Sequence, residues 1–259
     1  MKVLIHPTET GAVNCVADQI ATRLVRQPDA VLGLATGGTM ESVYRRLIEL
    51  NRQGYASFAR ATSFNLDEYV RLKPDHPCSY WYYMREHLFD HVDIDSARTH
   101  LPRGDAPDPE AEAARYEQAI RDSGDVGLQL LGLGANGHIG FNEPTSSLTS
   151  LTRIKTLTRS TREANARFFD RFDDVPRLAI TMGIGTILRA QEIVLLALGA
   201  GKADATAAMI EGPVSAACPA SALQMHPKVT VVLDEGAASK LTLRSYYEEV
   251  HPAGREAVI

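Results

Sequence analysis

The segment Leu130–Pro144 joins an apolar run to residue types that can exchange protons. Its first residues, Leu-Leu-Gly-Leu-Gly, are typical of a buried strand that ends in glycines, which permit backbone turns closed to other residues. Asn136, His138, Asn142 and Glu143 follow within eight residues. A histidine and a carboxylate held at a strand end could form an acid–base site. Taken alone, the loop is explained equally well as a polar turn that leaves a core strand.

A second candidate is the segment Thr36-Gly37-Gly38-Thr39, which joins a predicted strand to a predicted helix. Glycines let a ligand approach the backbone closely, and free N–H groups at a helix start favour an anion such as phosphate. The alternative is a tight turn in which Thr39 caps the helix. The segment matches neither a P-loop nor a dinucleotide-binding fingerprint, so nucleotide binding is disfavoured.

The segment Gly199-Ala200-Gly201-Lys202 repeats this arrangement later in the chain. A lysine in the first turn of a helix opposes the helix dipole unless an anion binds there. Lys202 therefore favours a phosphate contact, and a solvated lysine is the alternative.

Asp67 and Glu68 form a carboxylate pair directly after a predicted strand. On a strand the two side chains would point to opposite sides, so only one could easily enter a cleft. One of them would suit a base that removes a proton next to a carbonyl group. Helix capping or solvation are the alternatives for such a pair. No spacing of residues indicates a complete set of metal ligands, and we predict no metal.

Strand-like apolar runs alternate with segments of helical spacing along the chain. This alternation predicts an α/β fold, namely a single doubly wound, mostly parallel, Rossmann-like sheet with helices on both faces. No linker or repeat divides the sequence, so we expect one domain over residues 1–259. Since ligands of such folds bind at the carboxyl ends of the strands, the polar segments above should converge on one cleft. We expect strands at about 3–5, 31–35, 61–66, 128–133, 178–182, 193–198 and 229–233, and helices at about 13–25, 40–54, 79–91, 109–123, 161–169, 202–210 and 236–249.

Composition excludes some classes of protein. The net charge of -5 argues against nucleic acid as a main partner. No segment reaches the length and apolarity of a membrane span, and the first residues lack the apolar region of a signal peptide. The three cysteines are few, odd in number and far apart, which indicates a reducing compartment. We therefore expect a cytoplasmic protein.

Together these segments resemble the glucosamine-6-phosphate deaminase family, and the resemblance covers nearly the whole chain. The long segment around His138 is highly specific, whereas the Thr-Gly-Gly-Thr loop is shared with 6-phosphogluconolactonase-like relatives. The resemblance implies conversion of glucosamine 6-phosphate and water to fructose 6-phosphate and ammonia, without a cofactor. The segments that carry it are Leu34–Thr39, Phe64–Tyr69, Gly132–Pro144 and Arg153–Thr158.

The resemblance also implies roles for individual residues. Asp67 would be the base that moves a proton from C2 toward C1 of the sugar. His138 would be the acid–base group that opens the pyranose ring, with Asn136 and Glu143 orienting it. Gly137 would contact the sugar through its backbone. The implied phosphate-binding residues are Thr36, Gly37, Gly38, Thr39, Arg167 and Lys202.

Asn136 is a departure from some family members, which carry aspartate at this position. Asparagine cannot hold His138 by charge, so its imidazole should be less biased toward the protonated form. Other members also carry asparagine, so the departure bears on the pH optimum and not on activity itself.

The resemblance further raises the possibility of allosteric control. Some family members are hexamers that N-acetylglucosamine 6-phosphate activates. Residues of their effector site resemble five residues of this chain that are not contiguous in the sequence. An ordinary exposed basic pair at Arg153 and Lys155 is the alternative, and unregulated members exist. The corresponding residues here are Ser146, Arg153, Lys155, Thr156 and Tyr246.

Two other functions compete with the deaminase. A 6-phosphogluconolactonase would use the phosphate loops and one base, but the Asp67 segment and the His138–Glu143 segment favour the deaminase. A non-catalytic sugar-phosphate sensor is the second rival, since related folds serve in transcription regulators. The lack of a basic patch and of a DNA-binding extension counts against it.

Overall fold

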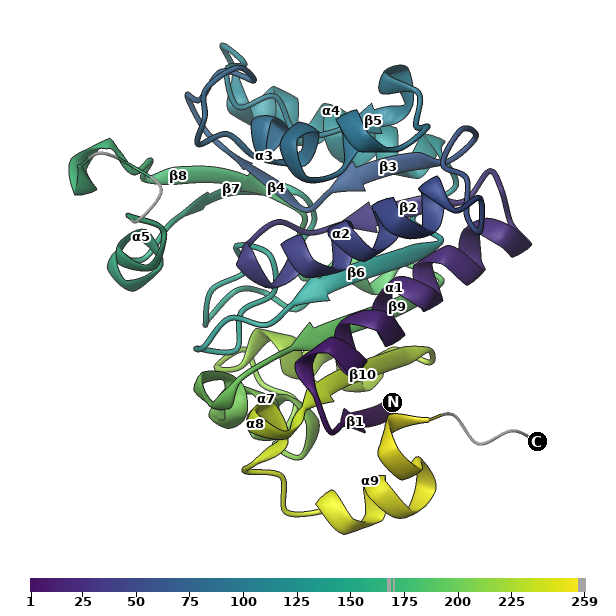
Figure 1. Ribbon diagram of the computed structural model, residues 1–259. Helices are drawn as coiled ribbons and strands as arrows, with labels where there is room; N and C mark the ends of the chain where they lie inside the picture. Colours follow the sequence, from purple (N-terminus) through teal and green to yellow (C-terminus); the bar gives the residue numbers. More distant parts are fainter. Residues whose placement is uncertain (167–168, 170, 256–259) are drawn as a thin grey trace.

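A seven-stranded sheet forms the centre of the molecule in the computed structural model, which describes residues 1–166, 169 and 171–255. Its strands are β1 (Lys2–His6), β2 (Val31–Leu34), β3 (Thr62–Asn65), β5 (Thr99–His100), β6 (Leu128–Gly132), β9 (Glu192–Ala197) and β10 (Val229–Asp234). They lie in the order β1-β10-β9-β6-β2-β3-β5, and each neighbouring pair is parallel (Figure 1). The predicted mostly parallel α/β sheet is confirmed.

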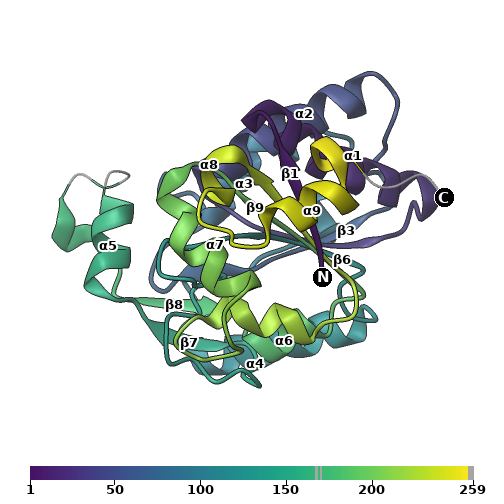
Figure 2. The same ribbon diagram turned by 90° about the horizontal axis from the view of Figure 1, so that it is seen from below.

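Helices cover both faces of this sheet (Figure 2). On one face lie α1 (Glu9–Arg26) and α2 (Gly38–Arg52), and on the other lie α4 (Pro109–Asp122) and α6 (Ile184–Leu188). The remaining α-helices of the described residues are α3 (Tyr80–His87), α5 (Arg159–Asn165), α7 (Ala203–Ile210), α8 (Glu235–Ala238) and α9 (Arg244–Val250). No helix in these described ranges is long and apolar enough to cross a bilayer.

Capping residues explain where α1 and α4 begin. Thr8 precedes α1, and its hydroxyl accepts a hydrogen bond from the Gly11 amide at 3.0 Å. Asp108 precedes α4, where its carboxylate accepts from two backbone amides at 3.0 Å each, and Pro109 occupies the first helical position. Such side chains satisfy N–H groups that have no partner within the helix.

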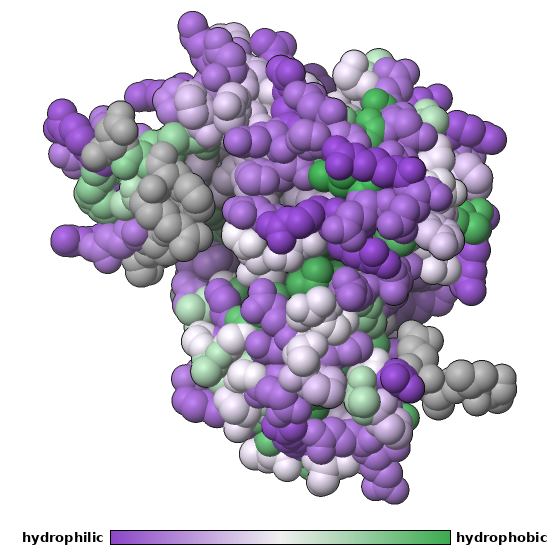
Figure 3. Space-filling view, viewed as in Figure 1, coloured by the Kyte–Doolittle hydropathy of each residue, from purple (hydrophilic) through white to green (hydrophobic). Residues whose placement is uncertain are grey.

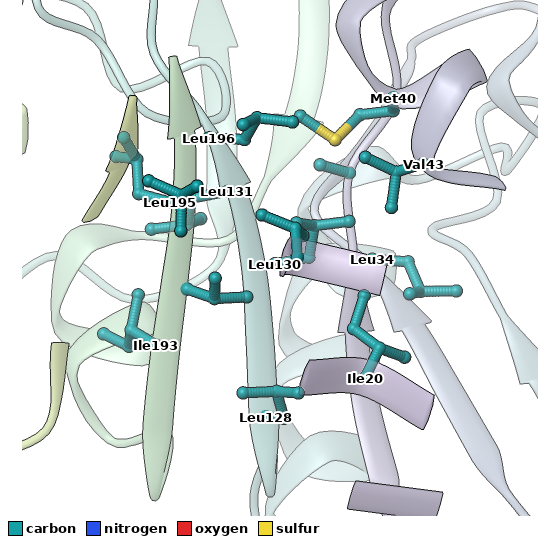
Figure 4. Packing of buried hydrophobic residues seen from close by; sticks show 14 of the residues in the cluster. Ile20, Leu34, Met40, Val43, Leu128, Leu130, Leu131, Ile193, Leu195 and Leu196 are labelled. Carbon is teal, nitrogen blue, oxygen red and sulfur yellow. The ribbon is translucent and has the colours of Figure 1, made fainter. Parts of the chain in front are cut away.

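The main core packs against both faces of the central strands, and Figure 4 shows the part next to the first two helices. Ile20 of α1 and Met40 of α2 lie on the side of the sheet to which Leu128, Leu130 and Leu196 project, and all of these side chains are almost completely buried. Full burial of each such side chain contributes roughly 1.5–3 kcal/mol. Gly132 at the end of β6 leaves room for Met40, because a Cβ there would lie 3.3 Å from the Met40 methyl carbon.

A second, antiparallel sheet stands beside the first and was not predicted. It contains β4 (Asp67–Tyr69), β8 (Leu178–Thr181) and β7 (Arg153–Thr156), in that order. Leu66 joins the two sheets, because its amide donates to Leu34 of β2 and its carbonyl accepts from Met182 after β8. Together with α5, strands β7 and β8 extend to one side of the main body (Figures 1 and 3).

The prediction of a single helix at 236–249 was wrong, since the chain there forms α8 and α9 with a break between them. The carboxylate of Glu211 accepts hydrogen bonds from the backbone amides of Thr242 and Leu243 at 2.8 and 2.9 Å. These contacts replace the helical hydrogen bonds that a continuous helix would require.

Candidate active site

The predicted site segments follow four strands that are neighbours in the central sheet, β9, β6, β2 and β3. From β2 the chain continues outward through β3 to β5, and from β6 it continues the other way through β9 to β10. The boundary between β2 and β6 is therefore a topological switch point, where parallel sheets bind ligands beyond the carboxyl ends of their strands. This order explains how segments distant in the sequence reach one site.

A hydrogen-bonded network orients the imidazole of His138. The Asn136 amide group donates to Glu143 Oε2 at 2.7 Å, and its Oδ1 lies 2.6 Å from His138 Nδ1. Because a carboxylate only accepts, the amide nitrogen must face Glu143 and the amide oxygen must face the ring. His138 Nδ1 therefore carries a proton, and Nε2 of the neutral ring is left to accept one from a ligand.

Glu143 is itself fixed by two threonines. It is 3 % exposed, and its Oε1 accepts from the hydroxyls of Thr161 and Thr158, the latter at 3.2 Å. Glu143 Oε2 also lies 3.7 Å from His138 Nδ1, close enough for its charge to act on the ring. The threonines were missed as site residues, although Thr158 ends the last segment that carries the family resemblance.

Two charges act on His138 in opposite directions. Burial is the largest effect and lowers the pKa of the imidazole, while the Glu143 charge raises it and the Lys202 charge lowers it. The imidazole is therefore biased toward its neutral form near neutral pH. Since its charge acts on the ring, the Lys202 ammonium group is near the loop after β6, residues 133–144 (the His138 loop).

The turn that carries His138 requires a glycine at position 134. A Cβ there would lie 2.3 Å from His138 Nδ1, so only glycine lets the ring pack against the chain. The Gly137 amide donates to Gly134 O at 2.9 Å, and the Gly137 carbonyl accepts from the Ala220 amide at 2.9 Å. A sugar contact by Gly137 would thus use the second lone pair of that carbonyl.

Asp67 begins β4, and its carboxyl group faces the His138 loop. It is 5 % exposed, and a Cβ added to Gly140 would lie 3.4 Å from Asp67 Oδ2. Burial, and secondly the charge of Glu68, raises the pKa of Asp67 to about 8. A carboxylate that ionises so reluctantly is a strong base once its proton has left.

Glu68 occupies the opposite side of β4, as the alternation of strand side chains requires. Its carboxylate accepts from the backbone amides of Tyr69, Tyr80 and Trp81 at 2.8, 3.0 and 3.0 Å. The prediction that only one acid of the pair enters the cleft agrees with this geometry. The helix-capping alternative thus applies to Glu68, but which helix it caps depends on contacts with α3 that the sequence does not show.

The Thr36–Thr39 segment leads from β2 into α2. The N-cap is Gly37, with φ of 111°, and no side chain caps the helix. The alternative in which Thr39 caps the helix was therefore wrong. Backbone N–H groups at an uncapped helix start are available to an anion.

Lys202 follows β9 as the last residue of a 3₁₀ turn, Ala200–Lys202, whose N-cap Gly199 has φ of 83° and corresponds to Gly37. It is the N-cap residue of α7, again without a side-chain cap, and burial lowers the pKa of its ammonium group. Before it, the Gly199 amide donates to the Asp234 carboxylate at 2.9 Å, which joins this loop to the start of α8. A bound anion would offset the desolvation of the Lys202 charge.

Arg167 lies outside the described residues. Of the predicted effector residues, Arg153 and Lys155 lie on one side of β7, while the alternation of the strand places Thr156 on the other. Ser146 is buried, and its amide donates to Glu143 O at 3.0 Å. Tyr246 belongs to α9, which is far from β7 in both views of the chain (Figures 1 and 2).

No group of three histidine, cysteine, aspartate or glutamate side chains suited to a metal ion occurs among residues 1–166, 169 and 171–255. Fold and site together define an α/β protein that places a buried carboxyl group and an oriented imidazole beside two helix starts suited to an anion.

Known proteins share this architecture and sequence. A family model described as glucosamine-6-phosphate isomerases/6-phosphogluconolactonase matches residues 8–232, and the chain belongs to this family. A glucosamine-6-phosphate deaminase of Cellvibrio japonicus is 52% identical over 250 residues, which cover 96% of this chain and 95% of the relative.

Solved structures agree with this assignment. A structure described as a monomeric glucosamine-6-phosphate deaminase matches with a TM-score of 0.91 and 48% identity, covering 93% of this chain and 100% of the other. A 6-phosphogluconolactonase from Trypanosoma brucei matches with a TM-score of 0.71 but only 20% identity, covering 93% of this chain and 98% of the other. This second likeness concerns the fold alone.

Proposed function

We propose that the protein is a deaminase that converts glucosamine 6-phosphate and water to fructose 6-phosphate and ammonia. The observation that carries this proposal is the approach of Gly140, in the His138 loop, to the carboxyl group of Asp67. Two acid–base groups from different strand ends therefore serve one cleft, as a reaction with separate proton transfers requires. The relatives that are about half identical to this chain are described as glucosamine-6-phosphate deaminases.

His138 opens the sugar ring in the first step of the proposed reaction. Its free Nε2 takes the proton of the O1 hydroxyl and returns it to O5 as the bond between C1 and O5 breaks. The product is the open-chain aldehyde. Asn136 keeps the proton of the ring on Nδ1, so that Nε2 remains the reacting atom.

Asp67 then moves a proton between two carbons. The ionised carboxylate removes the proton from C2, which leaves an enolamine with its double bond between C1 and C2, and returns it to C1. The resulting iminium group at C2 takes up water, and the amino-alcohol collapses to the ketone of fructose 6-phosphate as ammonia leaves. The proton count is conserved, and no oxidant or reductant takes part.

The phosphate group binds between the two helix starts in this proposal. Thr36, Gly37, Gly38 and Thr39 offer backbone N–H groups, and Lys202 offers its charge. Arg167 stays a prediction from the family resemblance. The chain acts as one domain in the cytoplasm in this account, which the small, odd number of widely spaced cysteines supports.

An assay of purified protein with glucosamine 6-phosphate tests the proposal by measuring ammonia and fructose 6-phosphate. Asp67→Asn should retain sugar-phosphate binding and lose turnover by at least ~1000-fold, because the amide cannot accept the C2 proton. Persistent turnover would remove Asp67 as the base. Turnover of 6-phosphogluconolactone alone would identify a lactonase, and binding without any turnover would identify a sensor.

An effector site on β7 is a further part of this proposal, with N-acetylglucosamine 6-phosphate as activator. Burial lowers the pKa of Lys155, as does the charge of Arg153, so a bound phosphate would relieve both effects. The Glu143 charge also acts on Lys155, which links the site to the His138 loop. Tyr246 could contribute to this effector site only from a second copy of the chain.

Light scattering and activity measurements with and without N-acetylglucosamine 6-phosphate separate the two parts of this effector proposal. Activation that Arg153→Ala abolishes would support the effector site. A hexamer would support a contribution of Tyr246 from a neighbouring copy, whereas an activated monomer would exclude it. Both a monomer and a hexamer are outcomes to be distinguished, because a similar solved structure is described as a monomeric deaminase.

A further inference from the structure

Glu68 is a buried charge that faces away from the proposed reaction. It is 2 % exposed, and its two oxygens accept from three backbone amides, those of Tyr69, Tyr80 and Trp81. Tyr80 and Trp81 are the first residues of α3, where N–H groups have no partner within the helix. The side chain thus joins the strand that carries Asp67 to the start of a helix.

The same helix contacts the proposed phosphate loop. The Tyr83 hydroxyl of α3 donates to Gly37 O at 3.0 Å. The Tyr80 hydroxyl is hydrogen-bonded to the Thr36 side chain and donates to the Tyr69 hydroxyl at 3.3 Å. Helix α3 therefore bridges the two ends of the cleft, with Asp67 on one side and the loop after β2 on the other.

We propose that Glu68 is a positioning residue that fixes the carboxyl group of Asp67 relative to the phosphate loop by holding α3 against β4. The proposal rests on the function proposed above. A sugar phosphate bound at the loop presents its C2 atom at a set distance from the phosphate, so the base must stand at that distance. A misplacement of about 1 Å can lower the rate of such a reaction about 100-fold.

Glu68 also sets the pH at which Asp67 ionises. Both carboxyl groups are buried on one short strand, and the charge of Glu68 raises the pKa of Asp67 beyond the effect of burial. Burial likewise raises the pKa of Glu68 to about 7, against the effect of the three amides that donate to it. Loss of the Glu68 charge should therefore lower the pKa of Asp67.

Glu68→Gln is the direct test. Glutamine keeps the shape, but its amide nitrogen cannot accept, so at least one of the three backbone bonds is lost. We expect kcat/KM for glucosamine 6-phosphate to fall 10- to 100-fold at its optimum. The acidic limb of the pH profile should move to lower pH, because the neutral side chain no longer opposes ionisation of Asp67.

Glu112→Gln is a matched control. Glu112 is also a buried carboxylate, 5 % exposed, that accepts from the Arg103 backbone amide at 2.8 Å. It lies on α4 and pairs with Arg115, and within the described residues its hydrogen bonds reach no proposed site residue. Its substitution should lower the melting temperature and leave the acidic limb unchanged. If Glu68→Gln behaves like this control, or keeps wild-type kcat/KM, the positioning role is refuted.

Tyr83→Phe tests the other end of the link and serves if Glu68→Gln does not fold. Removal of its hydroxyl should weaken inhibition by inorganic phosphate several-fold, because Gly37 loses its contact with α3. Unchanged inhibition would refute the bridge. Wild-type protein that fails to release ammonia would refute the proposed function instead, so the two failures are distinguishable.

Discussion

Asp67→Asn should make the folded protein more stable, and the gain should grow with pH. Burial first, and the Glu68 charge second, raises the pKa of Asp67 from 3.8 to about 8. Since the carboxyl group in the unfolded chain keeps its ordinary pKa, the folded state binds more protons between these two values. The free energy of unfolding contributed by this group therefore falls as the pH rises from about 4 to about 8.

The size of the effect follows from the same shift. At pH 7 the unfolded carboxyl group lies about three units above its pKa, and each unit corresponds to ~1.4 kcal/mol. The destabilisation that ionisable Asp67 causes at this pH is thus at most about 4 kcal/mol. The asparagine amide group costs about 1–2 kcal/mol where it lacks an acceptor. We expect a net gain of about 2 kcal/mol at pH 7 and a net loss of about 1–2 kcal/mol near pH 4, where only the cost of the amide group remains.

Urea denaturation between pH 5 and pH 8 measures this difference. Trp81, the single tryptophan, adjoins Glu68 and provides a fluorescence signal, which circular dichroism can verify. Asp93→Asn is the control, because the pKa of Asp93 is lowered by hydrogen bonds that include those of Ser57 and Phe58, which outweigh its burial. That variant should lose stability near neutral pH. A gain for Asp67→Asn that does not change with pH, or a loss at every pH, would refute the argument.

Three further substitutions test the site. Lys202→Ala should raise KM about 10- to 100-fold with little change in kcat, because a phosphate contact contributes similar binding before and during the reaction; a fall in kcat alone would mean that Lys202 is misplaced. Gly134→Ala should lower kcat/KM at least ~100-fold while the far-ultraviolet spectrum stays native, since its Cβ would lie 2.3 Å from His138 Nδ1; an active variant would show that the ring need not stay in place. Asn136→Asp should raise the pKa of His138, because a negative charge replaces the amide oxygen 2.6 Å from Nδ1. A nuclear magnetic resonance titration of the ring checks this shift, with His138→Gln for assignment, and a constant pKa would contradict the network around Glu143.

Six of the seven strands of the main sheet could be predicted because each has a strong local signal, whereas β5 was missed because it is only two residues long. Strands β6 and β9 are nearly continuous apolar runs, as parallel strands buried on both faces must be. Strands β4 and β7 were not placed in a second sheet, because they are short and rich in charged residues. Their pairing with β8 depends on contacts between distant segments, and no local pattern carries that information.

The residue types of the candidate site could also be read from the sequence. Glycines at the ends of apolar runs indicate the loops after β2, β6 and β9. Asp67 is indicated as a site residue by its position after β3. Thr161 could not be assigned a role in this way, and for Glu68 helix capping was only one of several alternatives. Their partners, α3 in one case and Glu143 in the other, come near only when the chain folds.

The sequence by itself determined the α/β class, the family and the chemical groups available to the site. Only the tertiary structure decided how those groups behave. Strand order brings Asp67 to the His138 loop, because neighbours in a parallel sheet need not be neighbours in the chain. Burial then raises the pKa of Asp67 and lowers that of His138, since removal of water penalises the charged form of each group. The identity of an acid or base is local, whereas its strength depends on everything packed around it.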